Sequence, residues 1–388
     1  MDITINPGKL SGSVTAIPSK SQAHRLLICA AFADTPTELH CPETNRDIEA
    51  TAACLNALGA DITRTSDGYR VCPIREVPET AVLNCCESGS TLRFMLPIAG
   101  ALGVDSIFQM AGRLPQRPLS PMWEEMERMG CTLTRPTADT IRCRGKLKCG
   151  KYSIDGGVSS QFITGLLFAQ SLIPGESELE ITGKVESRPY IEMTRRALAL
   201  FDAPKYHSPG KVSVEGDWSN GAFFLAAKAL GNDISVSNLN PDSPQGDRAV
   251  AEILPKLEKN VVVDASDIPD LVPILAVAAG ARQGASFTNI QRLRIKESDR
   301  VASVIAMIKA LGGKAEATED TLTVYGTGYT GGTVDAVNDH RIAMAAAIAA
   351  TVCTEPVTIL DAHAVKKSYP RFWEEYGRLG GNYEQHIR

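Results

Sequence analysis

The sequence lacks an excess of positive charge and any apolar run long enough to cross a membrane. Its 388 residues include 40 Lys and Arg against 45 Asp and Glu, a formal net charge of -5. This balance argues against a protein that mainly coats a polyanion such as DNA, so any anion site must be local. No apolar run reaches the roughly 18 residues of a bilayer span, and the alternation at Met1–Thr4 indicates a strand and not a signal peptide. We therefore expect a cytoplasmic protein.

The sequence also lacks the residue spacings that are typical of metal and disulfide centres. None of its 10 Cys stands in Cys-x-x-Cys spacing, and its 6 His form no His-x-x-x-His pair. Cys29, Cys54 and Cys353 lie inside apolar runs, which favours buried reduced thiols. We therefore expect no metal ion.

What is present is the composition of a globular protein, with 44% hydrophobic and 22% charged residues. A single core stops growing at roughly 250–300 residues, so the chain should divide into at least two domains.

One kind of helical segment recurs and is apolar on nearly all sides, which predicts helices buried inside a domain. Each copy begins with a cluster of small polar or charged residues and is followed by a short alternating strand. The six copies are residues 24–33, 92–102, 162–172, 221–230, 271–281 and 342–352.

A second, amphipathic kind of helical segment alternates with the first and often ends in Leu-Gly, as expected for outer helices. Each copy leads into a strand pair, and the copies with the start of these strands are residues 52–65, 122–135, 193–206, 250–263, 301–316 and 372–385. Together they predict six units of roughly sixty residues, three per domain, in an α/β fold. A generic α/β fold with a parallel sheet would explain the alternation, but not the polar cluster at every buried helix start. Helix N-termini that open toward one place would attract anions.

Charged residues stand at several of these helix starts. Lys20 and Arg25 flank the first buried helix, where a lysine can meet a phosphate as a point charge; a solvated helix cap is the alternative. Arg341 opens the helix richest in alanine, and its planar guanidinium suits a carboxylate or phosphate. Arg93, Arg117 and Lys367 extend the theme, although each alone is more often a surface charge.

The segment Arg292–Arg300 concentrates basic residues before an amphipathic helix. Lys296 and Arg300 stand at i,i+4, a repulsion that a bridging anion would remove, and Glu297 could serve as a general acid or base beside it. Asp270 begins an apolar helix, either as an N-cap or as a base kept ionised by surrounding positive charge. A charged exposed face is the alternative for the basic segment.

Ten motifs, taken in order, resemble the motif series of 5-enolpyruvylshikimate-3-phosphate synthases over the whole chain. They are PSKSQAHR, SGSTLR, RLPQRP, VSSQF, SRPY, EGDWS, IPD, RIKESDR, NDHR and KKSYP. The resemblance implies a two-domain enolpyruvyl transferase fold of six βαβαββ-type units, with the active site in the interdomain cleft. An N-terminal domain, 18–215, would be inserted into a C-terminal domain made of 1–17 and 216–388.

The resemblance also implies a reaction without metal or cofactor, in which the enolpyruvyl group of phosphoenolpyruvate moves to the 5-hydroxyl of shikimate 3-phosphate through a tetrahedral ketal. Asp270 would be the base, Glu297 the proton donor, and Lys20 would touch both substrates. The shikimate 3-phosphate binders would be Lys20, Ser21, Arg25, Ser159, Ser160, Gln161, Ser187, Asp270 and Lys296. The phosphoenolpyruvate site, where the herbicide glyphosate also binds, would comprise Lys20, Gly89, Arg93, Arg117, Arg300, His340, Arg341 and Lys367.

Some positions depart from the family pattern, among them Cys86, Glu87, Ser90 and Arg292, which puts glyphosate sensitivity in doubt. The related enzymes that use UDP-N-acetylglucosamine usually carry a reactive cysteine in the loop that corresponds to Met110–Pro118, and this loop has none. RNA 3'-phosphate cyclases and a repeat scaffold without chemistry are further alternatives. We expect a monomer whose partners are the two small substrates, with no nucleic acid and no membrane.

Overall fold

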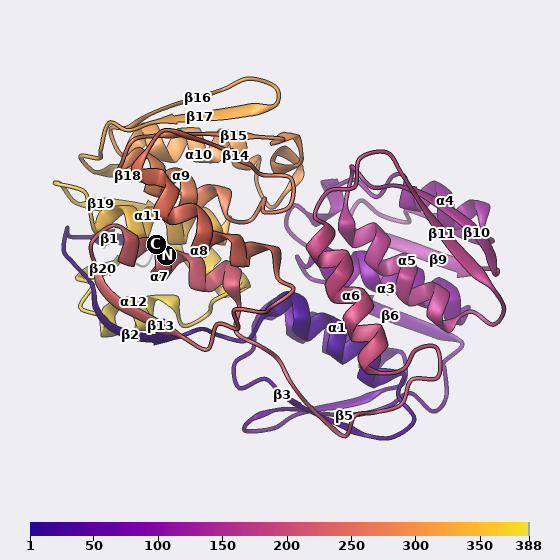
Figure 1. The fold of residues 1–388 in the computed structure, drawn as a ribbon. Helices are drawn as coiled ribbons and strands as arrows, with labels where there is room; N and C mark the ends of the chain where they lie inside the picture. Colours follow the sequence, from indigo (N-terminus) through magenta and orange to yellow (C-terminus); the bar gives the residue numbers. More distant parts are fainter. Residues whose placement is uncertain (387–388) are drawn as a thin grey trace. The chain divides into compact units, whose positions relative to one another are not determined.

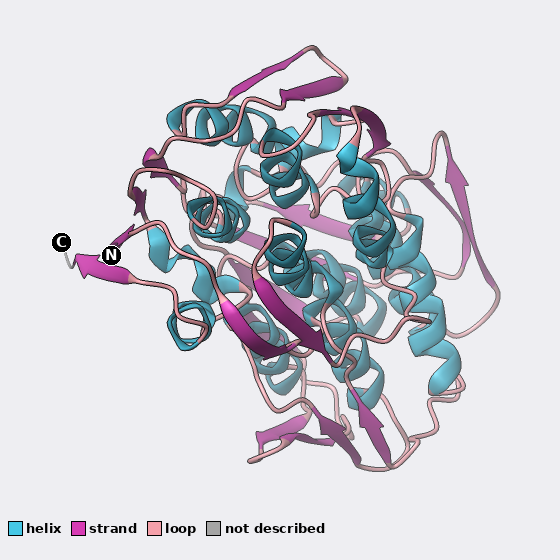
Figure 2. Cartoon of the chain, turned by 60° about the vertical axis from the view of Figure 1, so that its left-hand side comes forward, coloured by secondary structure: helices cyan, strands magenta, loops and turns pink. Residues whose placement is uncertain are grey.

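The computed structural model describes residues 1–386, and the chain forms two compact units. Unit A is Pro18–Val214, and unit B combines Met1–Ile17 with Glu215–Arg388. Each unit has its own hydrophobic core. Helices and short strands alternate along the chain in both units (Figures 1 and 2).

The six apolar segments form helices as predicted, and each is buried over most of its length. They are α1 (Lys20–Ala31), α3 (Gly89–Leu102) and α5 (Ser160–Leu172) in unit A, and α7 (Trp218–Ala229), α9 (Val272–Gly280) and α11 (His340–Ala350) in unit B. Five begin behind a side chain that accepts a backbone N–H of the first turn, which satisfies one of the helix's orphan donors. These caps are Ser19, Ser88, Ser159, Asp217 and Asp339.

Six amphipathic segments lie outside these helices. They are α2 (Arg46–Ala57), α4 (Met122–Arg128), α6 (Arg188–Leu200), α8 (Val250–Ile253), α10 (Arg300–Ala310) and α12 (Phe372–Arg378). The continuous helix predicted before the strand at the end of 250–263 is wrong, because α8 gives way to a 3-10 helix at Leu254–Glu258 (η3). Pro255 has no N–H to donate, and its ring would clash with the carbonyl four residues earlier. Further 3-10 turns are η1 (Leu114–Gln116), η2 (Gly246–Ala249), η4 (Gln291–Ile295) and η5 (Ala362–Lys367).

Four sheets share one topology, in which a parallel strand pair is extended by two antiparallel strands. In unit A the order β6-β7-β9-β8 joins Thr80–Asn84, Asp105–Gln109, Thr140–Gly145 and Cys131–Thr134, and β12-β3-β5-β4 joins Lys211–Ser213, Thr37–His40, Gly68–Cys72 and Asp61–Arg64. In unit B the order β14-β15-β17-β16 joins Val261–Asp264, Ala285–Thr288, Thr321–Tyr325 and Lys314–Ala317, and β18-β19-β1-β20 joins Gly332–Asp335, Val357–Leu360, Asp2–Ile5 and Tyr383–His386.

Two further sheets contain only a parallel pair. These are β10 (Gly150–Asp155) with β11 (Ser177–Thr182) and β2 (Ser11–Thr15) with β13 (Asp233–Ser237). Here the outer helix leads into the next strand without a hairpin, since only residues 201–210 follow α6 and only 259–260 follow η3. All six units therefore contain one buried and one outer helix, but two of the six sheets have only two strands.

Close helix packing positions the N-termini in unit A. Gly165 of α5 lies against α3, and a Cβ added there would overlap the carbonyl oxygen of Arg93. Helix α1 packs on α2 and α6. None of the helices within residues 1–386 has the length and apolar character that a membrane span requires.

Candidate active site

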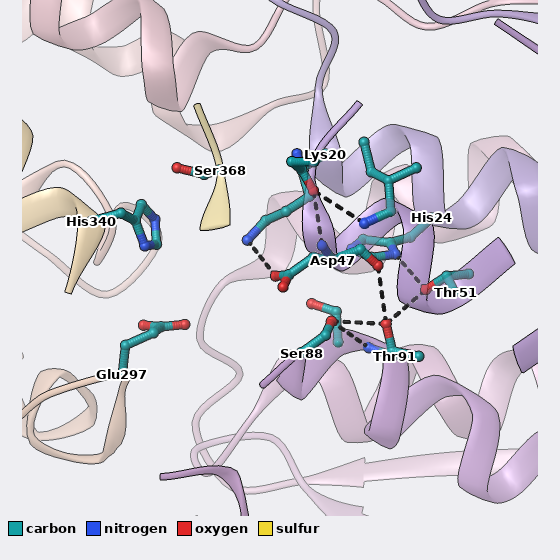
Figure 3. Close-up of polar contacts among 12 residues, drawn as sticks. Lys20, His24, Asp47, Thr51, Ser88, Thr91, Glu297, His340 and Ser368 are labelled. Atoms are coloured by element: carbon teal, nitrogen blue, oxygen red, sulfur yellow. Dashed lines mark hydrogen bonds and ion pairs between the residues drawn. The ribbon is translucent and has the colours of Figure 1, made fainter. Parts of the chain in front are cut away.

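Lys20 is the first residue of α1, and its ammonium is held by a carboxylate of the neighbouring helix. Lys20 Nζ lies 2.9 Å from Asp47 Oδ2, and both side chains are about one-sixth exposed. Asp47 belongs to the first turn of α2, behind the N-cap Asn45. Figure 3 shows the pair beside the N-terminal turn of α3. The predicted central lysine is therefore oriented and still reachable from solvent.

Two guanidinium groups converge on the start of α3, where Gly89 provides the space. A Cβ at Gly89 would lie 2.6 Å from Arg117 Nη1 and 3.1 Å from Arg93 Nη1. Arg93 Nη1 donates to Gln161 Oε1 at 2.6 Å, and Gln161 Nε2 donates to Ser90 Oγ at 2.9 Å. Four of the predicted residues are thus neighbours at the N-termini of α3 and α5, where helix dipoles add to the positive charge.

The remaining predicted residues of unit A have different surroundings. Arg25 is buried between helices, with Nε donating to Thr194 Oγ1 at 2.9 Å and Nη2 to the carbonyl oxygen of Tyr190 at 2.9 Å. Its Nη1 also donates to the carbonyl of Ser21 at 2.6 Å. Arg25 therefore joins α1 to α6. Ser159 caps α5, Ser160 is buried in its first turn, and Ser187 precedes α6 with a φ of 55°.

The carboxylate of Asp270 lies within a cluster of cations in unit B. Arg300 Nη1 donates to Asp270 Oδ1 at 2.6 Å, and Arg341 Nη2 donates to Asp270 Oδ2 at 3.0 Å. Lys296 Nζ stands 3.9 Å from Asp270 Oδ1. Asp270 is not the N-cap of α9, which begins at Val272 after Leu271 without a side-chain cap. The N-cap alternative is therefore wrong, and the carboxylate serves the charged cluster instead.

Lys296 and Arg300 do not form the helical i,i+4 pair that their spacing suggests. Helix α10 begins only at Arg300, whereas Lys296 follows the 3-10 turn η4 in an extended conformation. Both cations nevertheless approach one anion, the carboxylate of Asp270. Glu297 completes the arrangement, because Arg300 Nη2 donates to its Oε2 at 2.6 Å.

Asp339 orients this cluster from the start of α11. Its Oδ2 accepts Arg300 Nε and Ser298 Oγ, each at 2.9 Å, while Oδ1 accepts the backbone N–H of Arg341 at 3.0 Å. His340 and Arg341 are both buried. Lys367 Nζ donates to the carbonyl of Asn338 at 2.8 Å, so it also lies at this helix start.

The electrostatics of unit B keep the Asp270 carboxylate ionised and perturb a lysine. Burial would raise the pKa of Asp270, but Arg341, Lys296 and Arg300 together hold this pKa well below its ordinary value. The pKa of Lys296 is lowered to about 8, mainly by burial; Arg292 and Arg300 also lower this pKa, while Asp270 raises it. A carboxylate base beside a lysine that titrates near neutrality can move protons at physiological pH.

The sequence patterns did not single out three acidic residues that take part in or adjoin these clusters. Asp47 and Asp339 orient predicted cations, and their position in a helix first turn and an N-cap was the available signal. Asp247 is buried, and burial together with Asp270 raises its pKa to about 7. No group of His, Cys, Asp and Glu within the described residues could hold a metal ion.

The comparisons with known proteins agree with one another. A profile described as EPSP synthase (3-phosphoshikimate 1-carboxyvinyltransferase) matches residues 5–266 and 259–376. The 3-phosphoshikimate 1-carboxyvinyltransferase of Clostridium kluyveri is 37% identical over 418 residues, covering 99% of this chain and 98% of that protein. The enzyme of the same name from Clostridium beijerinckii is 36% identical over 428 residues, with coverage of 99% and 98%.

Solved structures have the same fold. An EPSP synthase of Acinetobacter baumannii superposes with a TM-score of 0.79 at 23% identity and covers 99% of both chains. An enolpyruvyl transferase of Streptomyces tendae gives 0.74 at 16% identity, covering 100% of this chain and 99% of that one. The fold is thus that of the enolpyruvyl transferases. Because its sequence matches the family profile and full-length relatives, the chain belongs to the EPSP synthase (3-phosphoshikimate 1-carboxyvinyltransferase) family.

Proposed function

We propose that the chain transfers the enolpyruvyl group of phosphoenolpyruvate to the 5-hydroxyl of shikimate 3-phosphate and releases inorganic phosphate. The observation that carries this proposal is the Asp270 carboxylate, which is 21% exposed and contacts Arg300, Arg341 and Lys296. Such a carboxylate stays ionised and can accept the proton of a substrate hydroxyl. The same cations can neutralise substrate phosphate and carboxylate groups.

The two charged clusters take different parts in the proposed reaction. In unit A, Lys20, Arg93 and Arg117 lie at the N-termini of α1 and α3 and are suited to anionic groups. We propose that they bind the phosphoenolpyruvate together with Gly89. The side chains proposed to contribute to shikimate 3-phosphate binding are Lys20, Ser21, Arg25, Ser159, Ser160, Gln161 and Ser187. In unit B, Arg300, His340, Arg341 and Lys367 complete the phosphoenolpyruvate site, while Asp270 and Lys296 bind the shikimate hydroxyls.

Addition comes first in the proposed mechanism. Asp270 accepts the proton of the 5-hydroxyl while the hydroxyl oxygen forms a bond to C2 of phosphoenolpyruvate. Glu297 delivers a proton to C3, so a tetrahedral ketal with a methyl group results. The positive side chains hold the phosphate and carboxylate of phosphoenolpyruvate in place during this step, because they are fixed before the reaction begins.

Elimination follows from the same ketal. The C2–O bond to phosphate breaks, and the phosphate leaves with the electron pair of that bond and takes the proton held by Asp270, which returns the base to its ionised form. C3 returns a proton to Glu297, and the C–H electrons form the new C2=C3 double bond. No electrons are exchanged with a third molecule, so the reaction requires only an acid, a base and cationic side chains from the protein. We further propose that the protein works as a cytoplasmic monomer.

Inorganic phosphate release by the purified, metal-free protein tests this function. Phosphoenolpyruvate is supplied with shikimate 3-phosphate in one series and with UDP-N-acetylglucosamine in another. We expect release only with shikimate 3-phosphate, and loss of release in Lys20→Met. Lys151→Met, which changes a surface lysine paired with Glu180, is the matched control. Release only with the sugar nucleotide would reassign the acceptor, and no release with either acceptor would refute the proposal.

A further inference from the structure

A chain of buried hydrogen bonds connects His24 to the helix that holds Lys20 in place. His24 Nδ1 lies 2.7 Å from Thr51 Oγ1 of α2, and Thr51 Oγ1 lies 2.8 Å from Thr91 Oγ1 of α3. Thr91 Oγ1 contacts the carbonyl oxygen of Asp47 at 3.3 Å and Ser88 Oγ at 2.8 Å. Figure 3 shows this path through three helices. His24, Thr51 and Thr91 are each 0% exposed.

The single hydrogens of the hydroxyl groups give the chain one direction. A carbonyl can only accept, so the hydrogen of Thr91 Oγ1 points to Asp47 or to Ser88 and not to Thr51. Either hydroxyl can be the donor in the contact between Thr51 and Thr91, and with the hydrogen of Thr91 used elsewhere the donor is Thr51. Its oxygen then accepts from His24, which requires the hydrogen to be on Nδ1 of the imidazole. His24 Nε2 is buried and has no hydrogen-bond partner among residues 1–386, and a bare ring nitrogen is easier to leave unsatisfied there than an N–H group.

The charges around His24 agree with this assignment. Burial lowers the pKa of His24 well below its ordinary value, and Lys20 and Arg25 on the same helix add to the effect. Asp47 of α2 is the acidic group on the facing element, and its carboxylate is engaged by Lys20. The ring therefore stays uncharged, with one hydrogen to donate.

The last residue of this series of hydrogen bonds, Asp47, lies beside the proposed active site. Asp47 offers its carbonyl oxygen to Thr91 and its carboxylate to Lys20 Nζ, at 2.9 Å. Fixing the first turn of α2 thus fixes the group that orients the Lys20 ammonium. We propose that His24 is a positioning residue that acts as an Nδ1–H donor through Thr51, Thr91 and Asp47 and holds Lys20 for the reaction.

This inference rests on the proposed function only through the role of Lys20. Its kinetic consequence follows from geometry, since a reacting group displaced by about 1 Å can cost about 100-fold in rate. His24→Leu removes the donor at similar volume, so we expect kcat to fall about 10- to 100-fold. The KM values of the two substrates should change less, because the anion-binding arginines remain in place.

Matched variants separate positioning from mere packing. His24→Asn places an amide N–H near the position of Nδ1–H and should restore kcat to within about threefold of the parent. Thr51→Val keeps the side-chain volume but breaks the series of hydrogen bonds, so it should lower kcat by the amount expected for His24→Leu. It therefore tests the inference even if His24→Leu does not fold. The double variant His24→Leu/Thr51→Val should lower kcat no further than either single variant does, as expected when both residues act through one connected path. His40→Leu, at an exposed histidine of the same unit, is the control.

A spectroscopic measurement tests the chain without any substrate. Long-range ¹H–¹⁵N correlation spectra of the whole protein, with ¹⁵N-labelled histidine, should show His24 as the uncharged Nδ1–H tautomer between pH 6 and 8, with His24→Asn providing the assignment. An Nε2–H tautomer, a titrating ring, or an unchanged kcat in folded Thr51→Val would overturn the inference. If the unaltered protein lacked turnover, the proposed function would fail while the tautomer still decided whether the donor chain exists.

Discussion

Replacing Lys296 with Met should make unit B more stable near neutral pH, although it removes a predicted substrate contact. The Lys296 side chain is 20% exposed and stands 3.9 Å from Asp270 Oδ1. Asp270 retains Arg300 and Arg341 as partners in the variant, at 2.6 and 3.0 Å. The substitution therefore removes a partly buried charge without leaving the carboxylate unpaired.

The magnitude follows from the lowered pKa of Lys296, which moves from the ordinary 10.5 to about 8. One pKa unit corresponds to about 1.4 kcal/mol, so at pH 6.5 the charged lysine costs the folded state about 3 kcal/mol. Between pH 8 and 10.5 the unfolded chain holds a proton that the folded chain has released, so stability rises with pH. At pH 9.5 the remaining cost is about 1 kcal/mol, a reduction of about 2 kcal/mol.

Urea unfolding at pH 6.5 and pH 9.5 measures this difference, with tryptophan fluorescence as the signal because Trp218 and Trp373 both lie in unit B. Lys296→Met should exceed the parent in unfolding free energy at pH 6.5, and the gap should shrink by about 2 kcal/mol at pH 9.5. Lys309→Met, at an exposed lysine of α10, should show no such pH dependence. A variant less stable than the parent at both pH values would refute the reasoning.

Three further predictions concern other residues of the two units. The raised pKa of Asp247 favours the folded state only while this carboxyl is protonated, so the parent should lose stability as pH rises from 4 through about 7. Asp247→Asn should not show this loss, and urea midpoints at pH 5 and 8 measure the difference. Gly165→Ala should force α5 away from Arg93 of α3 and cost about 1–3 kcal/mol. Gly8→Ala, whose added Cβ would meet the carbonyl oxygen of Asn6 only at 4.0 Å, should not lower the thermal midpoint. Asp270→Asn should reduce kcat by about 100- to 10,000-fold, and a variant within tenfold of the parent would exclude Asp270 as the base.

The helix starts could be read from the sequence because their chemistry is local. A small polar residue before an apolar run is both the signal and the cap, as Ser19, Ser88 and Asp217 demonstrate. Pro255 is an equally local signal, one that predicts a helix break, but it lies within a run of apolar residues at helical spacing. The predicted helix is broken there. Local rules thus account for the elements and for most of their boundaries.

The connections between the charged residues could not be read in this way. Asp270 meets Arg341 across 71 positions and Arg300 across 30, so neither pairing leaves a spacing pattern. The sequence placed an anion beside Lys296 and Arg300 because of a helical i,i+4 spacing. That spacing is wrong, and the carboxylate of Asp270 lies beside both cations. Asp339 was overlooked because a cap and a carboxylate that orients Arg300 look alike in sequence.

The measurement that tests the account most directly is turnover in D₂O, with phosphoenolpyruvate and shikimate 3-phosphate, followed by mass spectrometry. Addition of a proton to C3 creates a methyl group, so the subsequent elimination should leave deuterium in the vinyl group of the product and in recovered phosphoenolpyruvate. Glu297→Gln should suppress both the incorporation and the turnover. Product that forms without deuterium at C3 would contradict the addition–elimination mechanism and the role assigned to Glu297.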